Sequence, residues 1–115
     1  MLTTLLGTPF QPSGEGAFLL LEDIGEPPYK IQRMLNHLLQ SGLLKGIKGV
    51  GIGSFSGSKI PKGANWSLRD VFVDFFHPLG IPVLGDLPFG HGKQNQPWLV
   101  GTSVHVTTDG EIHVE

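Results

Sequence analysis

The sequence predicts a small α/β domain with a mixed sheet, two main helices and a C-terminal hairpin. Short apolar runs bounded by turn residues alternate with two segments of helical periodicity, in the order strand, helix, strand, helix, strand. A tight turn at 108–110 then predicts a terminal hairpin. The 115 residues fit one domain, and seventeen glycines and nine prolines indicate many turns between short elements.

Three apolar runs are the expected core strands. The run 17–21 is uniformly apolar and lies between turn residues, which is typical of a strand buried on both faces. The runs 50–52 and 81–84 share these features. Residues 98–106 alternate enough to form a further strand, and 111–114 would complete the hairpin.

The two helices are predicted from their apolar stripes and end signals. The first begins at Pro27-Pro28, ends before Gly42 and has one buried stripe: Ile31, Met34, Leu35, Leu38 and Leu39. The second begins at Ser67, with Asp70 placed for a capping box. Its stripe is Leu68, Val71, Phe72, Phe75 and Phe76.

Composition excludes several classes of protein. A net charge of −2 without any Lys/Arg cluster argues against nucleic acid as a partner. No apolar run approaches the length of a membrane helix, and the start of the chain lacks the features of a signal peptide. The absence of cysteine excludes disulfides and fits a reducing compartment, so a cytoplasmic location is expected.

No metal or cofactor is expected. His105 and His113 alternate with valines and are predicted to face each other across the hairpin. A metal site there would need a third ligand and an open position, and the nearby Asp109 lies in the turn.

The candidate functional residues follow two of the predicted strands. His91 lies between two glycines after 81–84, where an open imidazole can exchange a proton. Glu22 and Glu26 follow the first strand. If the two strands are parallel neighbours, one of these glutamates would meet His91 at one edge of the sheet. A carboxylate that accepts the far N–H of an imidazole completes two thirds of a nucleophilic triad.

The nucleophile is the missing third of that triad. Ser54 and Ser56 follow the second strand, but residues 58–64 read as a loop, and a strand-to-helix elbow requires a helix. Simpler interpretations stay open at this point. His91 would be a turn residue bonded to the backbone, and the glutamates, Glu26 above all, would cap the first helix.

Three segments carry a family resemblance. Residues 19–35 (LLLEDIGEPPYKIQRML), 81–92 (IPVLGDLPFGHG) and 5–9 (LLGTP) resemble, in this order, motifs of the L,D-carboxypeptidases. These serine peptidases trim the terminal D-alanine from murein tetrapeptides and include the microcin-immunity peptidases. The resemblance implies a swivelling β/β/α domain that supplies a glutamate and a histidine to a serine held in an N-terminal α/β domain.

By matching motifs, the resemblance assigns His91 as the triad base and Glu22 as the triad carboxylate, with Glu26 as the fallback. The domain that supplies the serine is absent from residues 1–115, so this chain alone is expected to be inactive. The implied partners are a murein tetrapeptide and the N-terminal nucleophile domain. A homodimer is also expected, because a half-protein leaves the face of its missing domain exposed.

Two alternative functions stay open at this stage. One is a non-catalytic module that binds muropeptides or serves assembly. The other is an immunity-type peptidase that acts on aminoacyl or peptidyl nucleotides.

Overall fold

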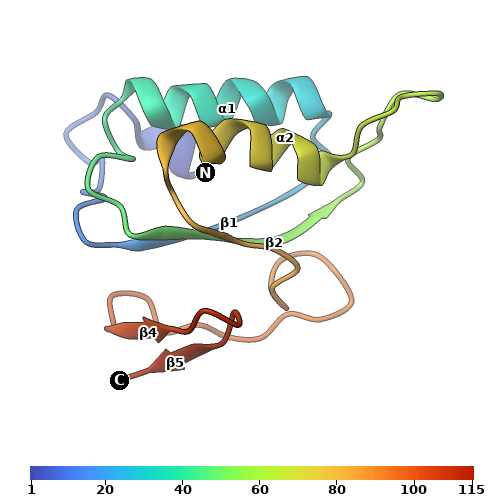
Figure 1. Ribbon diagram of the computed structural model, residues 1–115. Coiled ribbons are helices and arrows are strands. Elements are labelled where there is room, and N and C mark those ends of the chain that lie inside the picture. Colours follow the sequence, from blue (N-terminus) through green and yellow to red (C-terminus); the bar gives the residue numbers. More distant parts are fainter.

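The computed structural model describes residues 1–115. It contains a three-stranded parallel sheet in the order β1-β2-β3 and a separate two-stranded antiparallel sheet. Both α-helices lie on one face of the parallel sheet and the hairpin lies on the other side (Figure 1). The elements are η1 (Leu2–Leu5), β1 (Phe18–Ile24), α1 (Pro28–Gln40), β2 (Gly49–Ser56), α2 (Leu68–Phe76), η2 (His77–Leu79), β3 (Val83–Leu84), β4 (Val104–Val106) and β5 (Ile112–Val114).

The predicted α/β class, the two helices and the C-terminal hairpin are confirmed. The expected mixed sheet is instead divided, because the antiparallel strands pair only with each other. After β3 the backbone turns away at Asp86, whose φ is +56°, and Pro88 and Pro97 have no N–H to give to a ladder. The strand expected over 98–106 is therefore confined to 104–106, with Val100 exposed in the preceding loop.

The first two strands extend further than their apolar runs indicate. β1 continues to Ile24 and β2 to Ser56, so Glu22 lies within a strand and not after it. The two strands are hydrogen-bonded in parallel, with Leu19 opposite Val50 and Leu21 opposite Ile52. β3 is short, since only Val83 and Leu84 are paired with β2.

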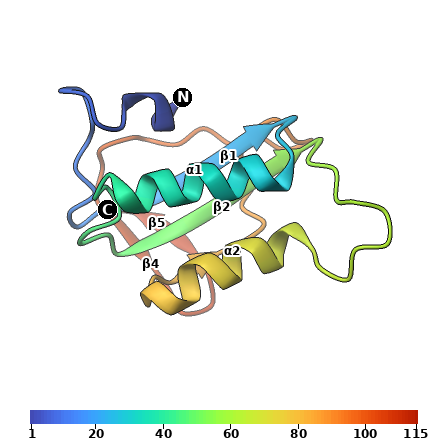
Figure 2. The same ribbon diagram turned by 90° about the horizontal axis from the view of Figure 1, so that it is seen from above.

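Both helices begin where the sequence predicts, and α1 also ends there. Gly42, at φ +80°, follows the last turn of α1 as a C′ residue. At the start of α2, the Ser67 and Asp70 side chains each accept a hydrogen bond from the other's backbone N–H. Viewed from above, α1 lies across β1 and β2 with α2 beside it (Figure 2). Neither helix has the length and apolar character of a membrane span.

The hydrophobic core lies between the helices and the parallel sheet. Val50 and Phe76 have no exposed surface. Burying a side chain of this size stabilises the fold by about 1.5–3 kcal/mol. The cluster comprises Leu6, Ile31, Leu35, Leu38, Leu43, Leu44, Val50, Ile52, Val71, Phe72 and Phe76. Beyond Phe76, Phe89 is the one buried residue.

The opposite face of β2 carries glycines in place of side chains. A Cβ on Gly49 would lie 2.9 Å from the Phe18 ring, and one on Gly51 would lie 2.5 Å from Leu87 Cδ1. Side chains from β1 and from the segment after β3 therefore lie directly on the backbone of β2. The loop that carries His91 lies on this same face of β2.

Candidate active site

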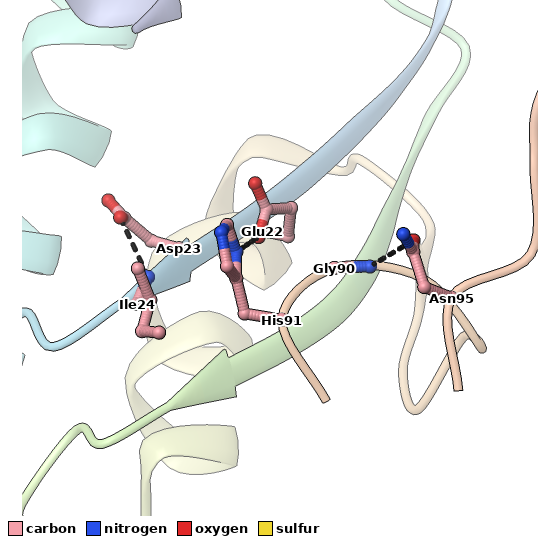
Figure 3. A network of polar contacts seen from close by, with 6 residues as sticks. All are labelled: Glu22, Asp23, Ile24, Gly90, His91 and Asn95. Atoms are coloured by element: carbon pink, nitrogen blue, oxygen red, sulfur yellow. Dashed lines mark hydrogen bonds and ion pairs between the residues drawn. The ribbon is translucent and has the colours of Figure 1, made fainter. Parts of the chain in front are cut away.

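A hydrogen bond joins His91 to Glu22. The imidazole Nδ1 lies 2.8 Å from the carboxylate Oε2 (Figure 3). Glu22 belongs to β1 and His91 to the loop after β3, so the two residues come from the opposite edges of the parallel sheet. The loop must therefore cross the central strand β2 to bring them together.

Gly53 is the point at which the loop crosses β2. Leu87 N donates to Ile52 O at 3.0 Å, and Ser54 N donates to Phe89 O at 2.9 Å, one on each side of this glycine. A Cβ on Gly53 would lie 2.6 Å from Phe89 O and 2.8 Å from the Phe89 ring. Real Cβ atoms essentially never approach so closely. Any side chain at this position would therefore lift the loop away from the strand.

A register shift opposite Glu22 places one extra residue in the central strand β2 at the same position. Leu21 pairs with Ile52 and Asp23 pairs with Phe55, so Glu22 alone lies opposite both Gly53 and Ser54. An extra residue of this kind is a β-bulge, which bends a strand and re-aims its side chains. Phe55 is thereby returned to the core, while Ser54 faces the histidine loop.

The glycines on either side of His91 allow the loop to approach this bulge. A Cβ on Gly90 would lie 2.5 Å from Ser54 Oγ and 3.0 Å from Glu22 Cβ, and its φ is +104°. A Cβ on Gly92 would lie 3.1 Å from Ser54 Cβ. The sequence predicts that these glycines leave the imidazole open, and the structure adds that they allow the loop to lie against Ser54 and Glu22.

The geometry of the pair suits proton transfer. An acceptor at Nδ1 fixes the neutral imidazole as the Nδ1–H tautomer, which leaves a lone pair on Nε2. The His91 side chain is 56% exposed and that of Glu22 is 33% exposed, so the pair is open to an incoming group. An exposed ion pair contributes only about 0–1 kcal/mol to stability. The backbone contacts around Gly53 are therefore what hold this geometry.

A cavity of about 420 Å³ lies beside the pair, lined by Glu22 and residues 89–91 and 95–98. Phe89 and Trp98 form one wall, with their rings edge-to-face at 5.7 Å and 78°. Sequence reasoning missed Asn95 and Gln96 as lining residues. The signal that could have found them is the run of amide side chains that follows the glycine-flanked histidine.

The other candidate carboxylate has a different partner. Glu26 Oε2 is shielded from solvent without a hydrogen bond and lies 3.4 Å from Lys30 Nζ, as an i, i+4 ion pair. The alternative capping role is wrong for both glutamates, because no side chain caps the start of α1, where Pro27 is the N-cap residue. The backbone N–H groups of Lys30 and Ile31 donate to Pro27 O. His91 is likewise no backbone-bonded turn residue, since its partner is Glu22.

Ser54 and the hairpin histidines lie where no chemistry is apparent. Ser54 Oγ is shielded from solvent without a partner, and the strand that carries it leads into a loop. It therefore lacks the exposure of a nucleophile on an elbow.

His105 and His113 face each other across the hairpin as predicted, and His113 Nε2 lies 3.1 Å from Glu111 Oε2. No group of three metal-ligating side chains surrounds them.

A base held by a carboxylate beside an open cavity is the arrangement found in hydrolases that use a nucleophile. Residues 1–106 match the profile of the LD-carboxypeptidase C-terminal domain, and the chain belongs to this family. The murein tetrapeptide carboxypeptidase of Pseudomonas aeruginosa is 36% identical over 86 residues, which are 75% of this chain and 28% of that protein. A Synechocystis sp. protein assigned to the carboxypeptidases is 41% identical over 108 residues.

Solved structures agree with this family membership. The chain superposes on the muramoyltetrapeptide carboxypeptidase of Oxalobacter formigenes with a TM-score of 0.86 and 36% identity, over 99% of this chain and 41% of that one. The microcin C7 self-immunity protein shares the fold, with a TM-score of 0.67 at 19% identity over 78% of this chain and 27% of that one. The 115 residues span about a third of the length of the curated relatives.

Proposed function

We propose that this chain supplies the base and the carboxylate of a serine carboxypeptidase that removes the terminal D-alanine from murein tetrapeptide. The observation that carries the proposal is the 2.8 Å contact between His91 Nδ1 and Glu22 Oε2, which leaves Nε2 free beside a cavity. The substrate is taken from the names of the relatives in Pseudomonas and Oxalobacter. The partner is a domain that carries the serine, and the place of action is the cytoplasm.

In the proposed reaction, His91 moves one proton in two steps. Nε2 accepts the proton of the serine hydroxyl while its oxygen attacks the carbonyl carbon of the bond to D-alanine. The imidazolium then donates that proton to the leaving amine, and the carbonyl-to-nitrogen bond breaks. Water subsequently attacks the acyl-enzyme by the same route and releases the shortened peptide. Glu22 keeps the imidazole in the required tautomer and stabilises its charge throughout.

The same proposal makes residues 1–115 inactive when they are alone. Ser54 Oγ, which faces the histidine loop, is shielded from solvent and is therefore not available to the base. Because catalysis by a triad depends on its members acting as a unit, loss of the nucleophile removes nearly all of it.

The test is a chimera. This chain replaces the matching segment of the Pseudomonas murein tetrapeptide carboxypeptidase, and release of D-alanine from murein tetrapeptide is measured. We expect activity from the chimera, none from the chain alone, and a loss of about 10²–10⁴-fold in the chimera from either His91→Ala or Glu22→Ala. Glu26→Gln is the matched control, because Glu26 is paired with Lys30, and it should retain activity.

Thermal unfolding shows which variants of the chimera are folded. A folded chimera in which His91→Ala releases D-alanine as fast as the parent would overturn the proposal. Release of D-alanine by the chain alone would contradict the expected inactivity. Binding of the tetrapeptide without any turnover in the folded chimera would favour a non-catalytic binding module.

A further inference from the structure

Asn95 uses only one end of its side-chain amide within the chain. Gly90 N donates to Asn95 Oδ1 at 3.1 Å, as Figure 3 shows beside the His91–Glu22 pair. A backbone N–H can only donate, so the atom that faces it must be the amide oxygen. The Nδ2 group, with its two hydrogens, therefore points elsewhere. It makes no hydrogen bond to another residue, although Asn95 lines the cavity beside His91.

The contact from Asn95 closes the loop that carries the histidine. A second closing contact is the bond from Gln96 N to Pro88 O, at 2.7 Å. Between these two contacts lies a segment with glycines at 90 and 92, and such a segment has many accessible backbone conformations. The direction of His91 therefore depends on the bonds that hold the residues directly before it.

We propose that Asn95 positions His91 through its amide oxygen and binds the peptide substrate through its amide nitrogen. The first part stands on the contact with Gly90 alone. The second part rests on the proposed peptidase function. The expected acceptor is an uncharged peptide carbonyl of the substrate. No Lys or Arg lines the cavity, so nothing there matches the charge of a terminal carboxylate.

Two substitutions separate the two ends of the amide. Asn95→Asp retains an oxygen that can accept from Gly90 N but has no N–H to donate. Asn95→Ala removes both groups. A tethering role predicts that only the alanine variant disturbs the loop, whereas a substrate contact predicts that both variants weaken binding.

The tether is tested by NMR on the 115-residue chain. In Asn95→Ala we expect protection of the Gly90 amide against hydrogen exchange to fall at least about tenfold. The ring nitrogens of His91 should then report a mixture of tautomers at mildly alkaline pH. Asn95→Asp should match the parent in both measurements. Unchanged protection and an unchanged tautomer in Asn95→Ala would overturn the positioning role, and a purely structural role would leave the tautomer unaltered.

The substrate contact is tested by kinetics in the Pseudomonas chimera. We expect Asn95→Asp to raise KM for murein tetrapeptide about tenfold, the loss of one hydrogen bond, with kcat changed less than about threefold. Asn95→Ala should raise KM and also lower kcat. An unchanged KM in Asn95→Asp would overturn the substrate contact. Failure of the proposed function is distinguishable, because the chimera would then be indifferent to His91→Ala while the NMR result for Gly90 remained.

Discussion

Residues 1–84 and residues 85–115 are stabilised by different interactions. The first part contains the whole hydrophobic cluster, packed between α1, α2 and the parallel sheet. In the second part Phe89 is the one buried side chain, and the terminal hairpin forms its own sheet. Burial of apolar area therefore stabilises the first part, while hydrogen bonds and one aromatic anchor hold the second in place.

The candidate site lies across the boundary between these parts. Glu22 belongs to the packed part and His91 to the lightly packed part. A base on a lightly packed loop can be displaced without unfolding the domain. The comparison therefore predicts that some substitutions change the stability of the domain and that others change the site.

The largest effect on stability is expected from Phe76→Ala. Phe76 is fully buried, and truncation of a core phenylalanine costs about 3–5 kcal/mol of unfolding free energy. Val100→Ala is the counterpart in the other part of the chain. Its side chain is 97% exposed, so its cost should be within about 0.5 kcal/mol. Urea denaturation measures both. Equal losses would contradict the division into two differently stabilised parts.

The next largest effect is expected where the histidine loop crosses β2. Gly53→Ala places a Cβ 2.6 Å from Phe89 O, which should cost about 1–3 kcal/mol and separate His91 from Glu22. Gly85→Ala is the matched control, because a Cβ there meets nothing within 4 Å. The His91 tautomer, read by NMR, should change only in Gly53→Ala. A parent-like tautomer in that variant would show that the crossing does not position His91.

A smaller effect is expected at the start of α2. Ser67 Oγ accepts from Asp70 N at 3.3 Å, and Ser67→Ala should cost about 1 kcal/mol through loss of this cap. Ser67→Asn retains a capping acceptor and should cost only a few tenths of a kcal/mol. Chemical denaturation provides the measurement. The NMR signals of His91 should be the same in both variants, and a shift in them would link α2 to the site.

The smallest effect is the pH dependence from the same cap. Hydrogen bonds from the Ser67 backbone N–H and hydroxyl hold the pKa of Asp70 below its usual value of 3.8. A carboxyl with a lowered folded-state pKa contributes stability above its usual pKa, and this contribution is lost as pH falls through the folded value. As the pH falls below about 4, the unfolding free energy of Asp70→Asn should therefore decrease less than that of the parent. Denaturation experiments at several pH values measure this difference, with Asp74→Asn, outside the cap, as the control variant.

The sequence carries enough information for the local parts of this fold. Apolar stripes and end signals at Gly42 and Ser67 predict both helices, because these signals act within a few residues. The family motifs and the glycines around His91 indicate which residues to pair. Local patterns alone predict neither the crossing over Gly53 nor the choice of Glu22 over Glu26, which only the family motifs indicate. Both depend on a register shift between two strands, and no local pattern encodes it.

The separation of Glu22 and His91 along the chain has a consequence for folding. The two residues are 69 positions apart, and β2 must already lie beside β1 before the loop can cross it. Contacts between distant residues form late, because closing a long loop is entropically costly until other contacts compensate. On a nascent chain, every residue of the hydrophobic cluster also leaves the ribosome before His91. The hydrogen bond between the imidazole and the carboxylate therefore marks the end of folding, and its NMR signature would report how much of a preparation has reached the native state.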